Sequence, residues 1–194
     1  MATNEERSRA TRSSILTAAR ECFVADGYEN THTDTILERA GVSRGALYHH
    51  FPSKRDVFEA VYILVVEETI GHALDHQRSS DSPIEELLHA CSAWLRFVRK
   101  PEIATILLEQ GPQVLGWSRA REIESSSSLP PMRLSIERAC KAGEIEVPSV
   151  PVTSLMINAL LAEAALISAM SKPRVSNAVL EQSIRQFVEG LRTG

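Results

Sequence analysis

The chain has 194 residues, enough for one large domain or for a small domain fused to a larger one. Hydrophobic residues make up 43% of the chain and charged residues 24%, a composition that excludes a disordered or fibrous protein. The formal net charge is -4 at pH 7, so any affinity for nucleic acid requires a local cluster of positive charge.

The N-terminal region predicts one helix preceded by a polar tail. Apolar residues recur from Ile15 to Phe23 at positions i, i+3, i+4, i+7 and i+8, which places them on one side of a helix. Gly27 is a good left-handed cap and predicts the end of this helix. Residues 1–14 are polar and contain no charged-then-apolar leader, so we expect a frayed tail in a protein that is not exported.

Two short helices follow, joined by a tight turn. The second covers about residues 33–40 and is broken by Gly41, and the third begins after the capping residue Ser43 and ends before Pro52. This arrangement matches a helix-turn-helix, whose second helix enters the major groove of DNA. Residues 39–55 contain four Lys or Arg residues, two His residues and no carboxylate. This window supplies the local positive charge that an acidic protein needs for DNA binding.

The third helix is predicted to have a core side and an exposed side. Leu47 and Phe51 lie one turn apart and are expected to face the core. The residues left on the exposed side are Arg44, Gly45, Tyr48 and His49. An arginine there can donate two hydrogen bonds to the O6 and N7 atoms of guanine, and the small neighbouring residues let the helix approach the bases closely.

Helical patterns continue to the end of the chain. They cover approximately residues 53–76, 82–98, 101–109, 116–124, 132–142, 152–170 and 179–191. The segment SSSSLPP, residues 125–131, is expected to separate two of these helices. No stretch alternates as a strand would, so we predict an all-α fold of about nine helices.

The segment 152–170 is apolar on nearly all sides and long enough to be considered as a membrane span. We reject that interpretation because Asn158 and Glu163 lie inside the segment and no Lys, Arg, Trp or Tyr girdle flanks it. Alanines at intervals of three or four residues provide a face suited to close helix packing. We expect a helix buried on all sides, partly by another subunit, and no membrane partner.

Residues 15–61, ILTAARECFVADGYENTHTDTILERAGVSRGALYHHFPSKRDVFEAV, resemble the DNA-binding domain of the tetracycline-repressor (TetR/AcrR) family of bacterial transcription regulators. The motifs that carry the resemblance are GY at 27–28, AGVSRG at 40–45, LYHHF at 47–51 and SK at 53–54. Beyond residue 61 the likeness rests mainly on helix count and on GPQVLGWSRAREIE, residues 111–124. The resemblance implies a homodimer with an N-terminal helix-turn-helix DNA-binding domain, here residues 1–53, and a helical-bundle ligand-binding and dimerisation domain, here residues 54–194.

The resemblance also implies roles for individual residues. Base-proximal positions are Arg44, Gly45, Ala46, Tyr48 and His49. Phosphate-contacting positions are Thr31, His50 and Lys54. The sequence departs from the family pattern at Leu37, where alanine is usual, and at His32, where a small hydroxyl residue usually caps the second helix. Thr33 could supply the missing cap and is included among the DNA-binding candidates.

The implied dimer is a four-helix bundle made by the last two helices of each subunit. Its predicted interface consists of Ala159, Ala162, Leu166, Ala169, Ile184, Phe187, Val188 and Leu191. Such a dimer would hold two reading helices about 34–36 Å apart, one turn of B-DNA, and bind a palindromic operator. A small molecule that fits best when the fourth helix is swung would change this spacing, so we expect a repressor that its ligand releases from DNA.

The ligand is expected to bind between helices of the C-terminal bundle. The candidate lining residues are Trp94, Phe97, Leu107, Glu109, Gln113, Trp117, Met132 and Asn158. Packing in the hydrophobic core alone is the competing interpretation of the apolar members of this set. A transcriptional activator, or a repressor controlled by a protein partner, is the nearest alternative function.

A metal site is the alternative from another functional class. Glu68, His72 and His76 are spaced by four residues on one helix face, which suits a helical-bundle metal-binding protein or enzyme. A polar helix face in water accounts for the same residues, and no nucleophile–base pair or phosphate-cradling loop is visible, so we expect neither an enzyme nor a cofactor. The three cysteines, Cys22, Cys91 and Cys140, are odd in number, widely spaced and form no CxxC motif. They therefore indicate neither a disulfide framework nor a zinc site, which favours the cytoplasm.

Overall fold

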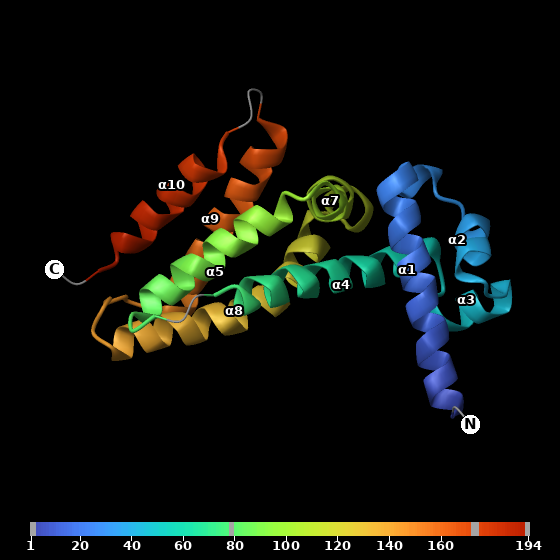
Figure 1. Ribbon diagram of the computed structural model, residues 1–194, viewed down its shortest axis with the longest axis horizontal. Helices are drawn as coiled ribbons and strands as arrows, with labels where there is room; N and C mark the ends of the chain where they lie inside the picture. The colour runs from blue at the N-terminus through green and yellow to red at the C-terminus, as the bar shows by residue number, and fades with distance from the viewer. Residues whose placement is uncertain (1–2, 78–79, 172–174, 193–194) are drawn as a thin grey trace. The chain divides into compact units, whose positions relative to one another are not determined.

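The computed structural model describes residues 3–77, 80–171 and 175–192 (Figure 1). These residues form helices, and their only extended pairing is an isolated bridge between Ile145 and Arg192. The predicted all-α fold is therefore confirmed. The chain divides into two compact units, residues 1–65 with 105–120, and residues 66–104 with 121–194.

The first unit contains the three N-terminal helices together with a segment from the middle of the chain. Its elements are α1 (Asn4–Asn30), α2 (Thr33–Ala40), α3 (Arg44–His50), the first half of α4 (Lys54–Asp75), the π-helix η1 (Thr105–Gln110), α7 (Gly111–Leu115) and the first turn of α8 (Trp117–Lys141). The domain boundary predicted between residues 53 and 54 does not coincide with this unit. The difference arises because residues 105–120 pack on α1 and α4, although they lie far from these helices in the sequence. They therefore belong to the first unit.

The N-terminal tail is helical, so the expectation of a frayed arm is wrong. The Thr3 hydroxyl accepts a hydrogen bond from the Glu6 backbone N–H at 3.1 Å, and the Glu6 carboxylate accepts one from the Thr3 N–H at 2.6 Å. This capping box satisfies two backbone donors that a helix start otherwise leaves unpaired. Helix α1 kinks at Gly27, whose positive φ of 78° matches the predicted cap position.

Helix α2 begins without a side-chain cap. His32 occupies the N-cap position and makes no capping hydrogen bond, and Thr33 is the first helical residue rather than the cap. The expectation that Thr33 replaces the missing hydroxyl is therefore wrong. Gly41 ends the helix in the left-handed conformation with φ 65°, which lets the chain turn sharply into α3.

Replacing His32 by serine is expected to stabilise the protein. A serine hydroxyl at the N-cap position can accept a hydrogen bond from an unpaired backbone N–H of α2, and such caps contribute about 0.5–2 kcal/mol. The free energy of unfolding, measured in urea, should increase for His32→Ser but not for the matched control His32→Ala. Equal stabilisation by both variants would contradict the capping explanation.

The segment 105–120 is attached to the first unit by specific contacts. The Gln110 side-chain amide donates to the Phe23 carbonyl at 2.8 Å. The Arg55 guanidinium donates to the carbonyls of Val114 and Leu115 at 3.2 and 3.1 Å. These bonds join η1 and α7 to both α1 and α4, so the segment is an integral part of this unit.

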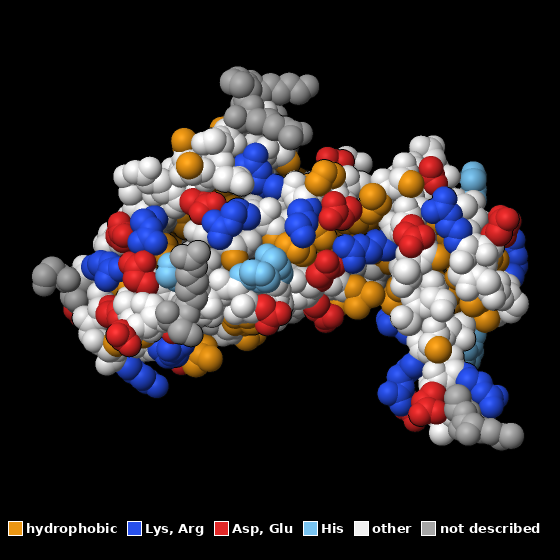
Figure 2. Space-filling view, viewed as in Figure 1, with side chains coloured by type: hydrophobic (Ala, Val, Ile, Leu, Met, Phe, Trp, Pro, Cys, Tyr) orange, Lys and Arg blue, Asp and Glu red, His pale blue; other side chains and the backbone are white. Residues whose placement is uncertain are grey.

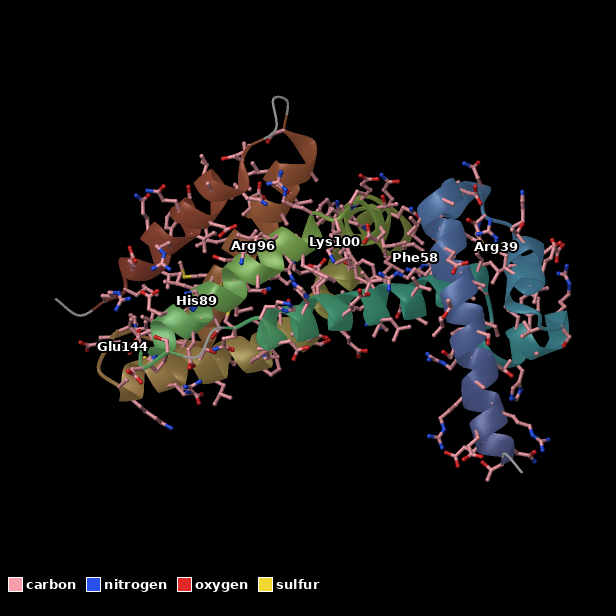
Figure 3. All side chains as sticks on the ribbon, viewed as in Figure 1. Arg39, Phe58, His89, Arg96, Lys100 and Glu144 are labelled. Carbon is pink, nitrogen blue, oxygen red and sulfur yellow. The ribbon has the colours of Figure 1, made fainter. Side chains whose placement is uncertain are left out.

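The second unit is a helical bundle with its own hydrophobic core. Its elements are the second half of α4, α5 (Pro83–Val98), α6 (Pro101–Ala104), most of α8, α9 (Val150–Met170) and α10 (Asn177–Glu189). The central side chains come from α5, α8, α9 and α10, for example Leu88, Ile136, Leu161 and Ile184. Glu144 caps α5 by accepting hydrogen bonds from the Ser82 hydroxyl at 2.9 Å and from the Ile84 N–H at 3.0 Å (Figure 3).

Helix α8 continues through the segment that was expected to be a linker. Pro130 and Pro131 lie inside the helix, so the predicted break at residues 125–131 is wrong. Prolines normally disfavour a helix interior because they remove backbone hydrogen bonds. Here Leu129, Met132 and Ile136 are buried on one face of the helix, and this packing outweighs the local preference of the sequence.

Candidate nucleic-acid interface

Helix α3 is held in place by a cap at its start and by two anchors in the core. The Ser43 hydroxyl accepts a hydrogen bond from the Ala46 N–H at 3.2 Å. Leu47 is completely buried and Phe51 is 4% exposed, as the sequence predicted. The cap and the anchors fix the orientation of the helix, and therefore the direction in which its other side points.

The other side of α3 is open to solvent. Arg44, Gly45, Tyr48 and His49 are all exposed, and Tyr48 retains 43% of its accessible surface. A Cβ atom added to Gly45 would meet nothing closer than the Ser43 hydroxyl oxygen at 4.0 Å. The structure thus brings together the four residues assigned to the exposed side, with Ala46 half-buried beside them.

Arg44 has a partner that the sequence analysis missed. Its guanidinium forms an ion pair with the carboxylate of Asp34 on α2, and both side chains are more than half exposed. An exposed pair of this kind contributes little to stability, because water screens both charges. Asp34 lies ten residues before Arg44 in another helix, and no local spacing rule joins the two positions.

Two of the predicted phosphate contacts are engaged inside the protein. Thr31 is 2% exposed and its hydroxyl donates to the Gly27 carbonyl at 2.7 Å, so Thr31 is removed from the candidate interface. The Lys54 ammonium donates to the carbonyls of Tyr28 and Thr31 at 2.8 and 3.1 Å and lies 4.2 Å from the centre of the Tyr28 ring. A lysine ammonium has three N–H groups, so one remains for a phosphate.

The remaining DNA-binding candidates lie at the edges of α2 and α3. Thr33 and His50 are half-buried, and the His50 ring packs against the His49 ring with 5.3 Å between their centres. Arg12, on α1, places its guanidinium 5.3 Å from the centre of the Phe51 ring at the end of α3. A cation from α1 therefore adjoins the candidate interface.

The predicted ligand-lining residues do not belong to one unit. Leu107, Glu109, Gln113 and Trp117 are in the first unit, whereas Trp94, Phe97, Met132 and Asn158 are in the second. Met132 belongs to the core of the second unit, and the Trp94 indole N–H donates to the Thr69 hydroxyl at 3.3 Å. Trp117 is 60% exposed, and Glu109 and Gln113 are also exposed.

The histidines considered for a metal site form a ring stack. The His72 ring lies 3.9 Å from the rings of both Phe97 and His76, and the His76 Nδ1 atom is 2.9 Å from the His72 carbonyl. Among the described residues, no group of three His, Cys, Asp or Glu side chains is placed to hold a metal ion. The geometry favours stacking over coordination for this face of α4.

The stacked His72 is expected to make stability depend on pH. Burial lowers the pKa of His72 from 6.5, the nearby charges of His76 and Lys100 lower it further, and Asp75 and Glu68 oppose this effect. The unfolded chain therefore binds more protons, and the free energy of unfolding decreases as the pH falls below about 6.5. Urea unfolding at several pH values should show a smaller decrease for His72→Phe, which keeps the stack. Identical pH profiles would contradict this prediction.

Helix α9 has a buried side and an exposed apolar side. Its segment Val150–Ala169 is apolar and long enough to cross a membrane. Core helices of soluble proteins can have the same length and composition. Only 28% of the most apolar 18-residue stretch of this segment is buried inside the protomer. Exposed apolar side chains of α9 and α10 include Val152, Leu155, Met156, Ala159, Ile167, Val179 and Phe187. Within one protomer α9 is therefore buried on one side only, and burial on all sides would require a second subunit, as expected from the sequence.

The predicted dimer residues are distributed over both sides of these helices. Ala159 and Phe187 are exposed, and Ala162, Leu166 and Ala169 are half-buried. Ile184 and Val188 are at most 5% exposed and pack in the core of their own protomer, together with the half-buried Leu191. Ile184 and Val188 are therefore removed from the candidate interface, because their side chains are covered within the protomer.

The chain matches two family models. Residues 15–61 match the model described as bacterial regulatory proteins, tetR family, and residues 84–191 match the tetracyclin repressor-like C-terminal domain. Together the two matches include all of α2 and α3, α5 except its first residue, and every later helix through α10.

Individual relatives agree with these matches. The HTH-type transcriptional regulator TtgW of Pseudomonas putida is 34% identical over 123 residues, which are 61% of this chain and 88% of TtgW. The HTH-type transcriptional regulator SrpR of Pseudomonas putida is 32% identical over 163 residues, 79% of this chain and 74% of SrpR. The crystal structure of a TetR-family regulator from Pectobacterium atrosepticum superposes with a TM-score of 0.84 at 26% identity, covering 100% of this chain and 99% of that one. The chain therefore belongs to the TetR family and is a helix-turn-helix transcriptional regulator.

Proposed function

We propose that the protein is a repressor that binds a palindromic operator as a homodimer and leaves it when a small molecule binds. The observation that carries this proposal is the uncovered side of α3, with Arg44, Gly45, Tyr48 and His49 exposed above two buried anchors. A capped helix with a small residue in its first turn can approach base edges closely.

Arg44 is proposed to read a base and Asp34 to orient it. The arginine fork fits the O6 and N7 atoms of guanine, a pairing that contributes about 1–3 kcal/mol of discrimination. The ion pair with Asp34 uses one guanidinium nitrogen and leaves other N–H groups for a base. Tyr48 and His49 follow on the same side and supply further hydroxyl or ring contacts.

The partner of the exposed side of α9 and α10 is proposed to be a second copy of the chain. On α9 the exposed apolar residues cluster between Val152 and Ala159, and Ile167 follows two turns later beyond the exposed Glu163. Val179 and Phe187 add exposed apolar side chains on α10. An exposed apolar patch of this extent marks an interaction surface, and a two-fold dimer covers the same patch on both subunits. Helix-turn-helix dimers read half-sites about 34–36 Å apart, one turn of B-DNA, and this is the spacing proposed for the operator.

The effector is proposed to act through the segment 105–120. This segment is hydrogen-bonded to α1 and α4 in the first unit. In the chain it follows Ala104 and precedes Arg121, which both belong to the second unit. A ligand that shifts α6 or α8 is therefore proposed to displace the segment 105–120, and with it the unit that contains α3. A coupling of about 1–3 kcal/mol would weaken operator binding 5- to 150-fold.

Arg44→Ala tests the proposed base readout. DNA fragments selected from a random pool by the parent protein provide the specific site, and gel shifts compare it with scrambled DNA at several salt concentrations. We expect Arg44→Ala to lose about 1–3 kcal/mol of preference for the selected site, with nonspecific binding largely kept. Arg138→Ala, which changes an arginine of the second unit, is the control and should keep the preference. An unchanged preference in Arg44→Ala would contradict the assignment of α3 as the reading helix.

A further inference from the structure

Helices α5 and α10 form an antiparallel pair whose outer edge is polar. The Arg96 guanidinium lies 2.8 Å from the Glu181 carboxylate, and the Arg185 guanidinium lies 3.0 Å from the Glu85 carboxylate. The more C-terminal residue on α5 pairs with the more N-terminal residue on α10, as in an antiparallel pair. The two ion pairs are about three helical turns apart along α5 and about one turn apart along α10. On α5 the stretch between the two ion pairs contains His89 and Ser92.

A cavity of about 510 Å³ opens between the two ion pairs, within the size range of small-molecule sites. It is lined by His76, His89, Ser92, Arg96, Ala178, Glu181, Gln182 and Arg185. Figure 3 labels His89 and Arg96 along α5, and Figure 2 shows histidine side chains among side chains of both charges on this face of the molecule. All the lining residues belong to the second unit.

The lining has hydrogen-bonding capacity that the described part of the chain does not use. The His89 Nδ1 atom is buried and has no hydrogen-bond partner there. This atom has less than 1 Å² of accessible surface, so protein atoms cover it, and Nε2 is the His89 atom left to bond an occupant. The Arg96 guanidinium bonds Glu181 through Nη1 alone, which leaves its Nε and Nη2 donors for another acceptor.

The chemistry of the lining selects the charge of the occupant. Two guanidinium groups, a hydroxyl, a side-chain amide and two imidazoles can all donate hydrogen bonds, whereas the one carboxylate, Glu181, is already bonded to Arg96. Arginine forks match the planar oxygens of carboxylates and the oxygens of phosphates. Both arginines are ion-paired, Arg96 with Glu181 and Arg185 with Glu85 and Glu189. The preference for an oxyanion therefore rests on the Nε and Nη2 donors of Arg96.

We propose that this groove binds a small organic anion that carries carboxylate or phosphate groups. Arg96 anchors one oxyanion, and His89 and Ser92 supply hydrogen bonds between the two ion pairs. The groove lies on the α5 side of α10, away from the exposed Val179 and Phe187 that are proposed to face a second subunit. The proposal is independent of operator recognition, since its test measures binding without DNA.

The test titrates the full chain with citrate and, separately, with inorganic phosphate, using amide NMR spectra and calorimetry. We expect at least one probe to bind and to shift the amide signals of His89, Ser92 and Gln182. Arg96→Gln should weaken this binding about tenfold or more, and Ser92→Leu, which fills the groove while keeping its charges, should weaken it as well. Arg138→Gln is the matched control, because Arg138 makes a surface ion pair of the same 2.8 Å length with Glu86 outside the groove.

The two probes distinguish the chemistry of the anion. Binding of citrate alone assigns the site to carboxylates, and binding of phosphate assigns it to phosphate-bearing molecules. The proposal is overturned if neither probe binds at millimolar concentration, or if Arg138→Gln weakens binding as much as Arg96→Gln. It is also overturned if Ser92→Leu binds like the parent.

Discussion

Replacing Gly45 by glutamate is expected to abolish DNA binding in a protein that remains folded. The position lies in the first turn of α3, where a Cβ atom meets open space, so the variant has room for the new side chain in the free protein. Glycine is a poor helix former, and a carboxylate near a helix N-terminus is favourable. In the proposed complex the same carboxylate would face bases and phosphates, and such like-charge contacts cost several kcal/mol.

The controls separate this effect from a general effect of added charge. Gly71→Glu places the same side chain on α4, where a Cβ atom also meets nothing within 4 Å, and should bind selected DNA like the parent. Gly45→Ala should increase the free energy of unfolding by about 0.5–1 kcal/mol and bind DNA better than Gly45→Glu. Gel shifts and urea unfolding measure both properties. Unchanged DNA binding by Gly45→Glu would show that this side of α3 does not approach DNA.

Gly111→Ala is expected to be among the most destabilising single substitutions in the first unit. Gly111 is buried against Tyr62, and a Cβ atom at position 111 would overlap the Cε2 atom of the completely buried Tyr62 ring. Overpacking of this kind costs about 1–3 kcal/mol, because neither the ring nor the backbone can move freely. The substitution should also loosen η1 and α7 from α4, so the release of operator DNA by an effector should change as well.

A double-mutant cycle with Tyr62→Leu tests the cause. Removing the ring destabilises the protein by itself, but it also removes the overlap, so Gly111→Ala should cost less in the Tyr62→Leu background. Urea unfolding of the four proteins gives the interaction energy, which we expect to be at least about 1 kcal/mol in this direction. Additive effects would mean that Gly111 and Tyr62 are not in close contact.

The α2–turn–α3 region could be predicted from the sequence because its signals are local. Ser43 as a cap, Gly41 in the turn, and Leu47 with Phe51 as core residues follow from short-range rules and are confirmed in the structure. The exposed side of α3 follows from the same helix geometry. Family membership follows because this region carries the motifs that resemble the TetR family, which the family models confirm.

Features that depend on tertiary packing could not be predicted in this way. Thr31 and Lys54 appeared free to contact phosphates, but their partners are carbonyls near the end of α1. The prolines of α8 suggested a break, yet burial of neighbouring side chains keeps the helix intact. In α9 both the side that packs in the core of the protomer and the exposed side are apolar. Hydrophobic periodicity therefore could not predict which side is buried.

The stoichiometry of the DNA complex tests the central claim most directly. Sedimentation of the protein with a duplex selected by the protein itself should give two chains per duplex, each inserting one α3 helix into a half-site. The Gly45→Glu variant should sediment as a dimer that does not bind the duplex. A single chain bound per duplex, or a parent protein that stays monomeric and binds no selected DNA, would contradict the account.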